Sequence, residues 1–144
     1  MAPHDPVRSD GHVFHISLRN TAAGASHARK QFIRFIEHHR LRREVVADIE
    51  AVVGEALANA AEHGYKRNGT IRIEALLTEE YLEASVSDDG PGFFLRGPVP
   101  VDHPPANSPR GYGIFLMRAL VEKLEFRNDG KTVWFRKQFE IAAD

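Results

Sequence analysis

The segment from Val45 to His63 carries apolar residues at intervals of three and four, which is the period of an amphipathic helix. At about 100° per residue the apolar side chains form one stripe, made of Val45, Val46, Ile49, Val52, Val53, Ala56, Leu57 and Ala60. A helix of this kind is stable mainly through the packing of its apolar face on another layer. The sequence therefore predicts a long helix over residues 41–65 that covers a second layer of structure.

Three polar residues follow one border of this stripe. Glu55, Asn59 and His63 stand four residues apart, one helical turn after another. A carboxylate and a carboxamide at the edge of a core are partly desolvated, and there they can bind a metal ion or polarise a water or hydroxyl. The solvated rim of an ordinary helix has the same composition, so this segment alone leaves both interpretations open.

A first glycine motif follows an alternating segment over residues 81–87 that is typical of a strand. The strand ends at Asp88, and Gly90 and Gly92 come directly after it. Because neither glycine has a Cβ atom, backbone can approach a flat ligand closely there. The carboxylate is a natural acceptor for an exocyclic amine, although an ordinary turn would have a similar composition.

A second glycine motif, Gly111 and Gly113, begins a helical pattern over residues 111–123. Glycines at the start of a helix leave backbone N–H groups and the positive end of the helix dipole accessible to phosphate oxygens. The two common phosphate-binding signatures are absent. Leu116 stands in place of the third glycine of a Rossmann fingerprint, and no Gly-Lys-Ser/Thr follows.

In this order the three motifs resemble the Bergerat-fold (GHKL, histidine-kinase-like) ATPase superfamily of gyrase, heat-shock chaperone, MutL and histidine-kinase nucleotide domains. The resemblance covers roughly Val45 to Phe135. The first motif, Glu-x-x-x-Asn-Ala-x-x-His followed by Gly64-Tyr65-Lys66, is similar to that of the anti-sigma factor serine/threonine kinases. The resemblance implies an α+β fold, a two-layer α/β sandwich in which three helices cover one face of a mixed, mostly antiparallel sheet.

The resemblance also implies a role for each matching position. Asn59 is expected to bind a Mg²⁺ ion that bridges the ATP phosphates, and Glu55 to act as general base on a serine hydroxyl. Asp88 is expected to accept a hydrogen bond from the adenine amino group. The other expected nucleotide-binding residues are His63, the adenine-pocket glycines Gly90 and Gly92, Arg110 near the γ-phosphate, the lid glycines Gly111 and Gly113, and Thr132 in support of the adenine-binding acid.

The remaining patterns supply the other elements of that fold. Further strands are predicted over residues 13–18, 70–77, 124–127 and 132–139, and a further helix over residues 26–39. Residues 78–80 and 128–130 are the expected hairpin turns. Residues 1–11 are expected to be a flexible tail, and residues 12–140 a single ATP-binding kinase domain with a mobile lid at about 93–110.

Composition narrows the class of protein. A length of 144 residues suits one domain with its own core, and a net charge of −1 gives no footprint of nucleic-acid or membrane binding. The absence of cysteine excludes disulfides and thiolate metal sites and is compatible with the cytoplasm, the expected location. No apolar run is long enough for a signal peptide or a membrane span.

The expected function is a protein serine/threonine kinase that binds ATP and ADP and phosphorylates a small partner of the anti-sigma antagonist type. It is also expected to sequester a sigma factor or a similar regulator, and to form a homodimer through residues 13–20 and 26–39. Two alternatives stay open: a nucleotide-binding switch without catalysis, and a histidine-kinase catalytic domain, although that class usually carries Asn where Glu55 stands. A gyrase-like or chaperone-like ATPase fragment is disfavoured, because such proteins are far larger.

Overall fold

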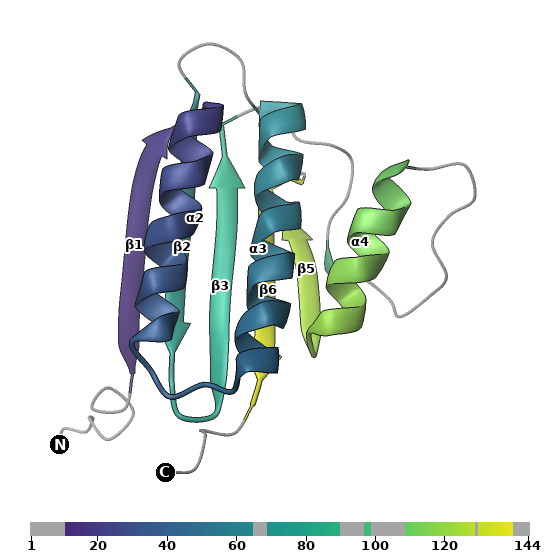
Figure 1. Cartoon of the computed structure of the whole chain (residues 1–144). Helices are drawn as coiled ribbons and strands as arrows, with labels where there is room; N and C mark the ends of the chain where they lie inside the picture. Colours follow the sequence, from purple (N-terminus) through teal and green to yellow (C-terminus); the bar gives the residue numbers. More distant parts are fainter. Residues whose placement is uncertain (1–10, 65–68, 90–96, 99–108, 129, 140–144) are drawn as a thin grey trace, which may run out of the picture.

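The computed structural model describes residues 11–64, 69–89, 97–98, 109–128 and 130–139 (Figure 1). The elements follow one another as β1 (His12–Arg19), α2 (Ala22–Glu37), α3 (Arg43–Gly64), β2 (Thr70–Leu77), β3 (Tyr81–Asp88), β4 (Gly97–Pro98), α4 (Pro109–Leu120), β5 (Lys123–Arg127) and β6 (Thr132–Gln138). Helices cover one face of a single sheet (Figure 1), which confirms the predicted two-layer α+β fold.

The sheet has the strand order β1-β2-β3-β6-β5-β4. Every pairing between described strands is antiparallel, so the parallel pairs that a mixed sheet would contain are not found in this part of the chain. The connection between β1 and β2 explains this for the first pair. Two helices, α2 and α3, lie between these strands, and the second helix reverses the direction of the first, so the chain enters β2 antiparallel to β1.

The core lies between the helices and the sheet. In β2 and β3 every second residue is buried, namely Ile71, Ile73, Ala75, Leu77, Leu82, Ala84 and Val86. The predicted stripe of α3 packs against this face, with Ile49, Val52, Val53, Ala56, Leu57 and Ala60 buried. Complete burial of an aliphatic side chain of this size contributes about 1.5–3 kcal/mol, so this layer contact fixes the position of α3 on the sheet.

The ends of several elements differ from the sequence prediction. Helix α2 begins four residues earlier than expected, because the Thr21 hydroxyl caps it by accepting a hydrogen bond from the Gly24 N–H at 2.9 Å. Helix α4 begins at Pro109, since proline lacks the N–H that the first turn of a helix leaves unpaired. The expected lid contains the unpredicted short strand β4, which pairs with β5.

A buried asparagine fixes the second half of α3 above the end of β1. The Asn20 side chain is almost completely buried and donates a hydrogen bond through Nδ2 to the Ala60 carbonyl oxygen at 3.2 Å. Its backbone N–H donates to the Gly69 carbonyl oxygen at 2.8 Å, directly before β2. The part of α3 that carries Asn59 is therefore attached to both first strands of the sheet.

No helix in the described part of the chain is long and apolar enough to cross a membrane.

Candidate functional site

Helix α3 presents Glu55 and Asn59 one turn apart at the border of its buried stripe, as predicted. Both residues are half-buried, because Ala56, Leu57 and Ala60 beside them face the core. Neither polar side chain has a hydrogen-bond partner among the described residues, so their oxygen atoms remain available to a ligand. His63 lies one further turn along α3, but its side chain is outside the described part.

Helix α4 brings Gly113 against the Glu55 carboxylate. An ideal Cβ atom on Gly113 would lie 2.6 Å from Glu55 Oε1 and 3.6 Å from Glu55 Cδ. Real Cβ atoms essentially never approach an oxygen this closely, so any larger residue at position 113 would displace the Glu55 side chain. Because Gly113 has no side chain, the glycine motif at the start of α4 and the Glu55–Asn59 motif of α3 can meet at one place.

Strand β3 ends at Asp88, a residue that is only 8% exposed. Its N–H donates a hydrogen bond to the Lys131 carbonyl oxygen at 3.0 Å, which joins the end of β3 to the chain before β6. By alternation, the Asp88 side chain belongs to the helix-facing set of β3. A carboxylate can accept several hydrogen bonds, so an acid at this buried strand end is compatible with the predicted contact to an exocyclic amine.

Thr132, expected to support the adenine-binding acid, contacts Ser87 and Asn128 among the described residues. The register pairs Thr132 with Ser87, their hydroxyl oxygens are 3.1 Å apart, and Asn128 Nδ2 donates to Thr132 Oγ1 at 3.1 Å. Directly paired residues project from the same face of a sheet, whereas successive residues of a strand project from opposite faces. The Thr132 side chain therefore shares the face of Ser87, while the Lys131 backbone contacts the Asp88 N–H. The role of Thr132 in support of the adenine-binding acid stays a prediction.

The other predicted contacts are only partly described. Arg110 and Gly111 lie in the first turn of α4, where backbone N–H groups have no partner within the helix, but the Arg110 side chain lies outside the described part. Gly90 and Gly92 also lie outside the described residues, as does most of the expected lid. The adenine-pocket and lid assignments therefore stay predictions.

The described residues contain no group of three or more His, Cys, Asp or Glu side chains that could hold a metal ion. A Mg²⁺ ion in a nucleotide site does not need such a group, because it keeps several waters and takes further oxygens from phosphates. Asn59, half-buried and without a described partner, can supply one neutral amide oxygen. The site is therefore compatible with a Mg²⁺ ion that binds together with the nucleotide.

Comparison with known proteins defines the class. Residues 18–137 match the histidine kinase-like ATPase domain, which covers most of the chain. The protein therefore belongs to this family, and the superfamily predicted from the three motifs is confirmed.

Individual relatives include proteins named serine-protein kinases. The chain is 30% identical over 101 residues to the serine-protein kinase RsbW of Halalkalibacterium halodurans, with 65% of this chain and 62% of the relative covered. It is 32% identical over 102 residues to the serine-protein kinase RsbW of Bacillus subtilis, with 64% of each chain covered. These alignments span less than two thirds of the relatives' length. They agree with the resemblance of the first motif to serine kinases.

A solved structure supports the fold. The RsbU and RsbW domains of Rv1364c from Mycobacterium tuberculosis superpose with a TM-score of 0.63 at 23% identity, over 92% of this chain and 33% of that chain.

Two contacts between α3 and other elements were not predicted from the sequence. One is the approach of Gly113 to Glu55. The other is a bridge from Lys137 to Asp48 and to the end of α4. Both join segments that are far apart in the chain, and such pairings leave no local period. A weak signal exists for the second contact, since Asp48 precedes Glu55 by seven residues and so lies on the same side of α3.

Proposed function

We propose that this protein is an ATP-dependent serine/threonine protein kinase in which Glu55 is the general base. The observation that carries the proposal is the approach of the Glu55 carboxylate to Gly113 in the N-terminal half of α4. It places a proton acceptor beside the helix start that would receive phosphate oxygens. The relatives named serine-protein kinases support the same reaction class.

Phosphoryl transfer requires mainly positioning and neutralisation of charge, and each predicted site residue has a part in this proposal. Backbone N–H groups at the start of α4 bind phosphate oxygens, and Asp88 accepts a hydrogen bond from the adenine amino group. Asn59 would contribute an amide oxygen to a Mg²⁺ ion that binds together with the nucleotide, and such an ion would supply neutralisation of phosphate charge. The oxygen of the substrate hydroxyl forms a bond to the γ-phosphorus of ATP, and the bond from that phosphorus to ADP breaks. Glu55 accepts the proton that the hydroxyl loses.

The acceptor in this proposal is a serine or threonine of a small protein of the anti-sigma antagonist type. The protein would also sequester a sigma factor or a similar regulator. The competing proposal is a nucleotide-binding switch, which would use Asp88, Asn59 and the start of α4 in the same way without transferring phosphate. The two differ only in whether Glu55 accepts a proton, so Glu55 is the residue to test.

The decisive experiment is Glu55→Gln, which keeps the shape of the side chain but removes its ability to accept a proton. Single-turnover phosphoryl transfer to a partner recovered from the native cell should fall by about 10²-fold or more, because general-base catalysis contributes roughly 10²–10⁴-fold. ATP affinity, measured by calorimetry, should stay close to that of the wild type. Glu44→Gln is the matched control, because Glu44 is exposed in the first turn of the same helix.

Two outcomes would contradict this assignment. If Glu55→Gln transfers phosphate at a rate near that of the wild type, Glu55 is an ordinary carboxylate on the rim of α3. If the wild type transfers nothing to any recovered partner, the protein is a nucleotide-binding switch.

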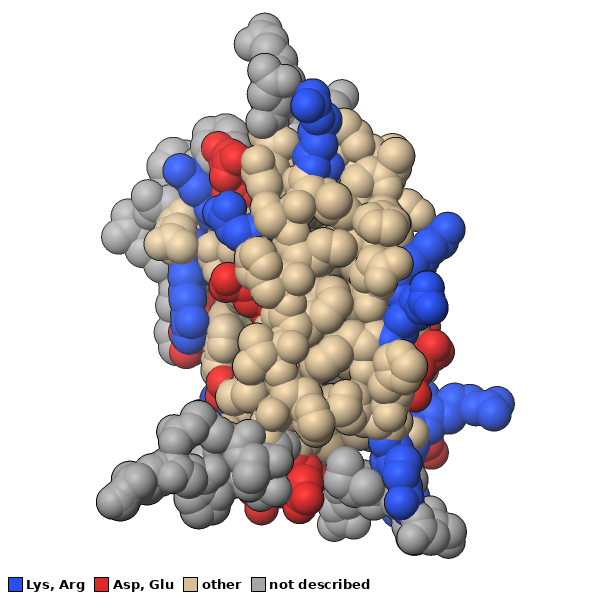
Figure 2. Space-filling model, turned by 90° about the vertical axis from the view of Figure 1, so that its left-hand side faces the viewer, with Lys and Arg blue, Asp and Glu red and all other residues tan. Residues whose placement is uncertain are grey.

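We also propose that the protein forms a homodimer through β1. This strand lies at the end of the sheet order, and Val13 is 77% exposed. Exposed edge strands usually carry charged residues that prevent pairing with another chain, yet His12–Leu18 contains no Lys, Arg, Asp or Glu. Figure 2 shows this side of the molecule, with an uncharged centre and Lys and Arg towards its margins. Light scattering at high micromolar concentration should give a dimer, and Val13→Lys a monomer; a monomeric wild type would contradict the proposal.

A further inference from the structure

Lys137 joins three elements on the helix side of the sheet. It pairs in register with Leu82, which is buried beneath the helices, so its side chain projects towards the helix layer. Its Nζ atom lies 2.9 Å from Asp48 Oδ2 in α3 and donates to the Leu120 carbonyl oxygen at 2.7 Å. Leu120 is the last residue of α4, so one ammonium group contacts the beginning of α3 and the end of α4.

This contact is more than a solvated surface pair. The Lys137 side chain is only 12% exposed and that of Asp48 34% exposed, so the charges are poorly screened by water. Hydrogen bonds between charged groups are shorter and stronger than neutral ones. A cation at the C-terminal end of a helix is also favoured by the helix dipole. Lys137 therefore holds the end of α4 at a defined place relative to α3.

The second contact between these two helices is the approach of Gly113 to Glu55. In α3, Glu55 comes seven residues after Asp48, and in α4, Leu120 comes seven residues after Gly113. Seven residues are two helical turns, or about 10 Å along a helix axis, so the two members of each pair share one side of their helix. The helices thus meet at two points that are equally spaced along both of them. A shift of α4 at one point is passed on to the other, because each helix is rigid over two turns.

We propose that Lys137 is a positioning residue of the nucleotide site. By fixing the end of α4 against Asp48, it sets how closely Gly113 approaches the Glu55 carboxylate two turns away. The catalytic consequence rests on the proposed kinase function, whereas the effect on the position of α4 does not.

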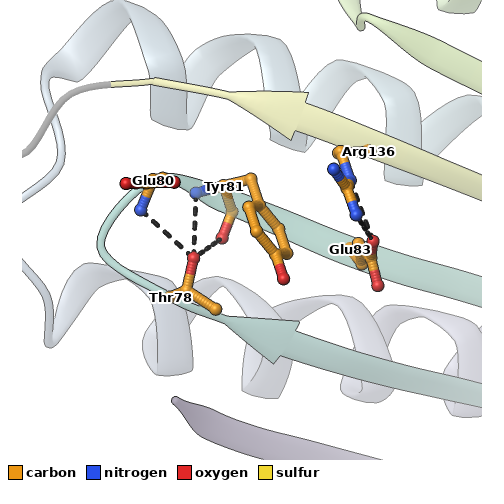
Figure 3. A network of polar contacts seen from close by, with 5 residues as sticks. All are labelled: Thr78, Glu80, Tyr81, Glu83 and Arg136. Atoms are coloured by element: carbon orange, nitrogen blue, oxygen red, sulfur yellow. Dashed lines mark hydrogen bonds and ion pairs between the residues drawn. The ribbon is translucent and has the colours of Figure 1, made fainter. Parts of the chain in front are cut away.

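The neighbouring residue provides a matched control. Arg136 precedes Lys137 on β6 and projects from the opposite face of the sheet, where its Nε donates to Glu83 Oε2 at 2.8 Å (Figure 3). The Arg136 guanidinium also lies over the Tyr81 ring, 4.1 Å from its centroid. Its side chain is 28% exposed and that of Glu83 25% exposed, so this ion pair is also partly buried. Its side-chain partners lie on β3, away from the helices.

The experiment compares Lys137→Met with Arg136→Met by hydrogen exchange of the nucleotide-free protein. Lys137→Met should speed exchange of the α4 amides by about tenfold or more, because a hydrogen bond to a charged group contributes about 1.5–3 kcal/mol. Exchange in the β2–β3 hairpin should stay unchanged. Arg136→Met should leave α4 protected. Lys137→Arg keeps a cation with several donors and should restore the protection of the α4 amides. Asp48→Asn removes the negative charge that Lys137 contacts in α3, and it should also speed exchange of the α4 amides.

Single-turnover transfer at saturating ATP provides the second measurement. Lys137→Met should slow transfer about tenfold, and adding Gly113→Ala should cause less than the product of the two separate losses, because both act on the same approach. Equal exchange rates of the α4 amides in Lys137→Met and Arg136→Met would overturn the proposal. A double variant whose loss of transfer equals the product of the Lys137→Met and Gly113→Ala losses would overturn it as well. If the wild type shows no transfer, the kinase function fails, and the role of Lys137 is decided by hydrogen exchange alone.

Discussion

The two ends of strand β3 differ in how their polar groups are used. At its start, the Thr78 hydroxyl oxygen accepts hydrogen bonds from the N–H groups of Glu80 and Tyr81, both at 3.1 Å, and the hairpin turn is closed (Figure 3). At its end lies the buried Asp88, and on α3 the side chains of Glu55 and Asn59 have no partner among the described residues. We call these the hairpin end and the nucleotide end. Polar groups satisfied within the chain stabilise a turn, whereas available ones can bind a ligand.

The largest effect that tests this comparison is expected from Asp88→Asn at the nucleotide end. ATP and ADP should both bind about tenfold to a hundredfold more weakly, because a buried hydrogen bond to a charged acceptor contributes about 1.5–3 kcal/mol and the adenine contact is the same in both. Calorimetric titration measures both affinities. Asp89→Asn is the control, because the Asp89 carboxylate is half-exposed and accepts a hydrogen bond from the Thr70 N–H at 3.0 Å. Unchanged affinity of Asp88→Asn for both nucleotides would remove Asp88 from the adenine site.

The sequence predicts the elements at both ends well, because their information is local. The stripe of α3 and the alternation of β2 and β3 repeat at 3.6 and 2 residues, and each repeat is long enough to recognise. Strand β4 has two residues and therefore no period to detect.

The contacts within the site depend on how distant segments are aligned, and local patterns do not contain that information. Thr132 shows the consequence, because its partner is set by the β3–β6 register, in which a shift of one residue would exchange the two faces of the sheet. The approach of Gly113 to Glu55 depends in the same way on the alignment of α4 with α3. A motif can therefore name the residues of a site while their contacts require the folded chain.

A smaller effect is expected at Gly54, which lies beside Glu55 in the middle of α3. An ideal Cβ atom there would have no neighbour within 4 Å, in contrast to the close approach at Gly113. Gly54→Ala should raise the free energy of unfolding by about 0.5–1 kcal/mol, because alanine loses less backbone entropy in a helix and the added methyl group meets nothing. Urea denaturation measures this gain. Gly113→Ala is the contrasting variant and should gain less, because its methyl group has to displace the Glu55 side chain. A lower free energy of unfolding in Gly54→Ala would contradict this prediction and would show that the added methyl group meets other atoms of the protein.

The smallest effect is expected at the hairpin end and concerns pH. The His39 ring lies 4.5 Å from that of His12 and 5.4 Å from that of Phe35, between centroids. Burial lowers the pKa of His39 from about 6.5, and the neighbouring His12 and His38 lower this pKa further. Below pH 6.5 the unfolded chain therefore takes up a proton more readily than the folded protein. Stability should accordingly decrease as the pH falls from 6.5 to the lowered pKa of the folded state, and it should gain nothing from this group above 6.5.

His39→Gln should reduce the dependence of stability on pH, measured by urea denaturation between pH 7.5 and 5.5. His27→Gln, on the exposed side of α2, should leave this dependence intact. ATP affinity should be the same in His39→Gln and the wild type at each pH, and a difference would show that the two ends of the sheet are coupled.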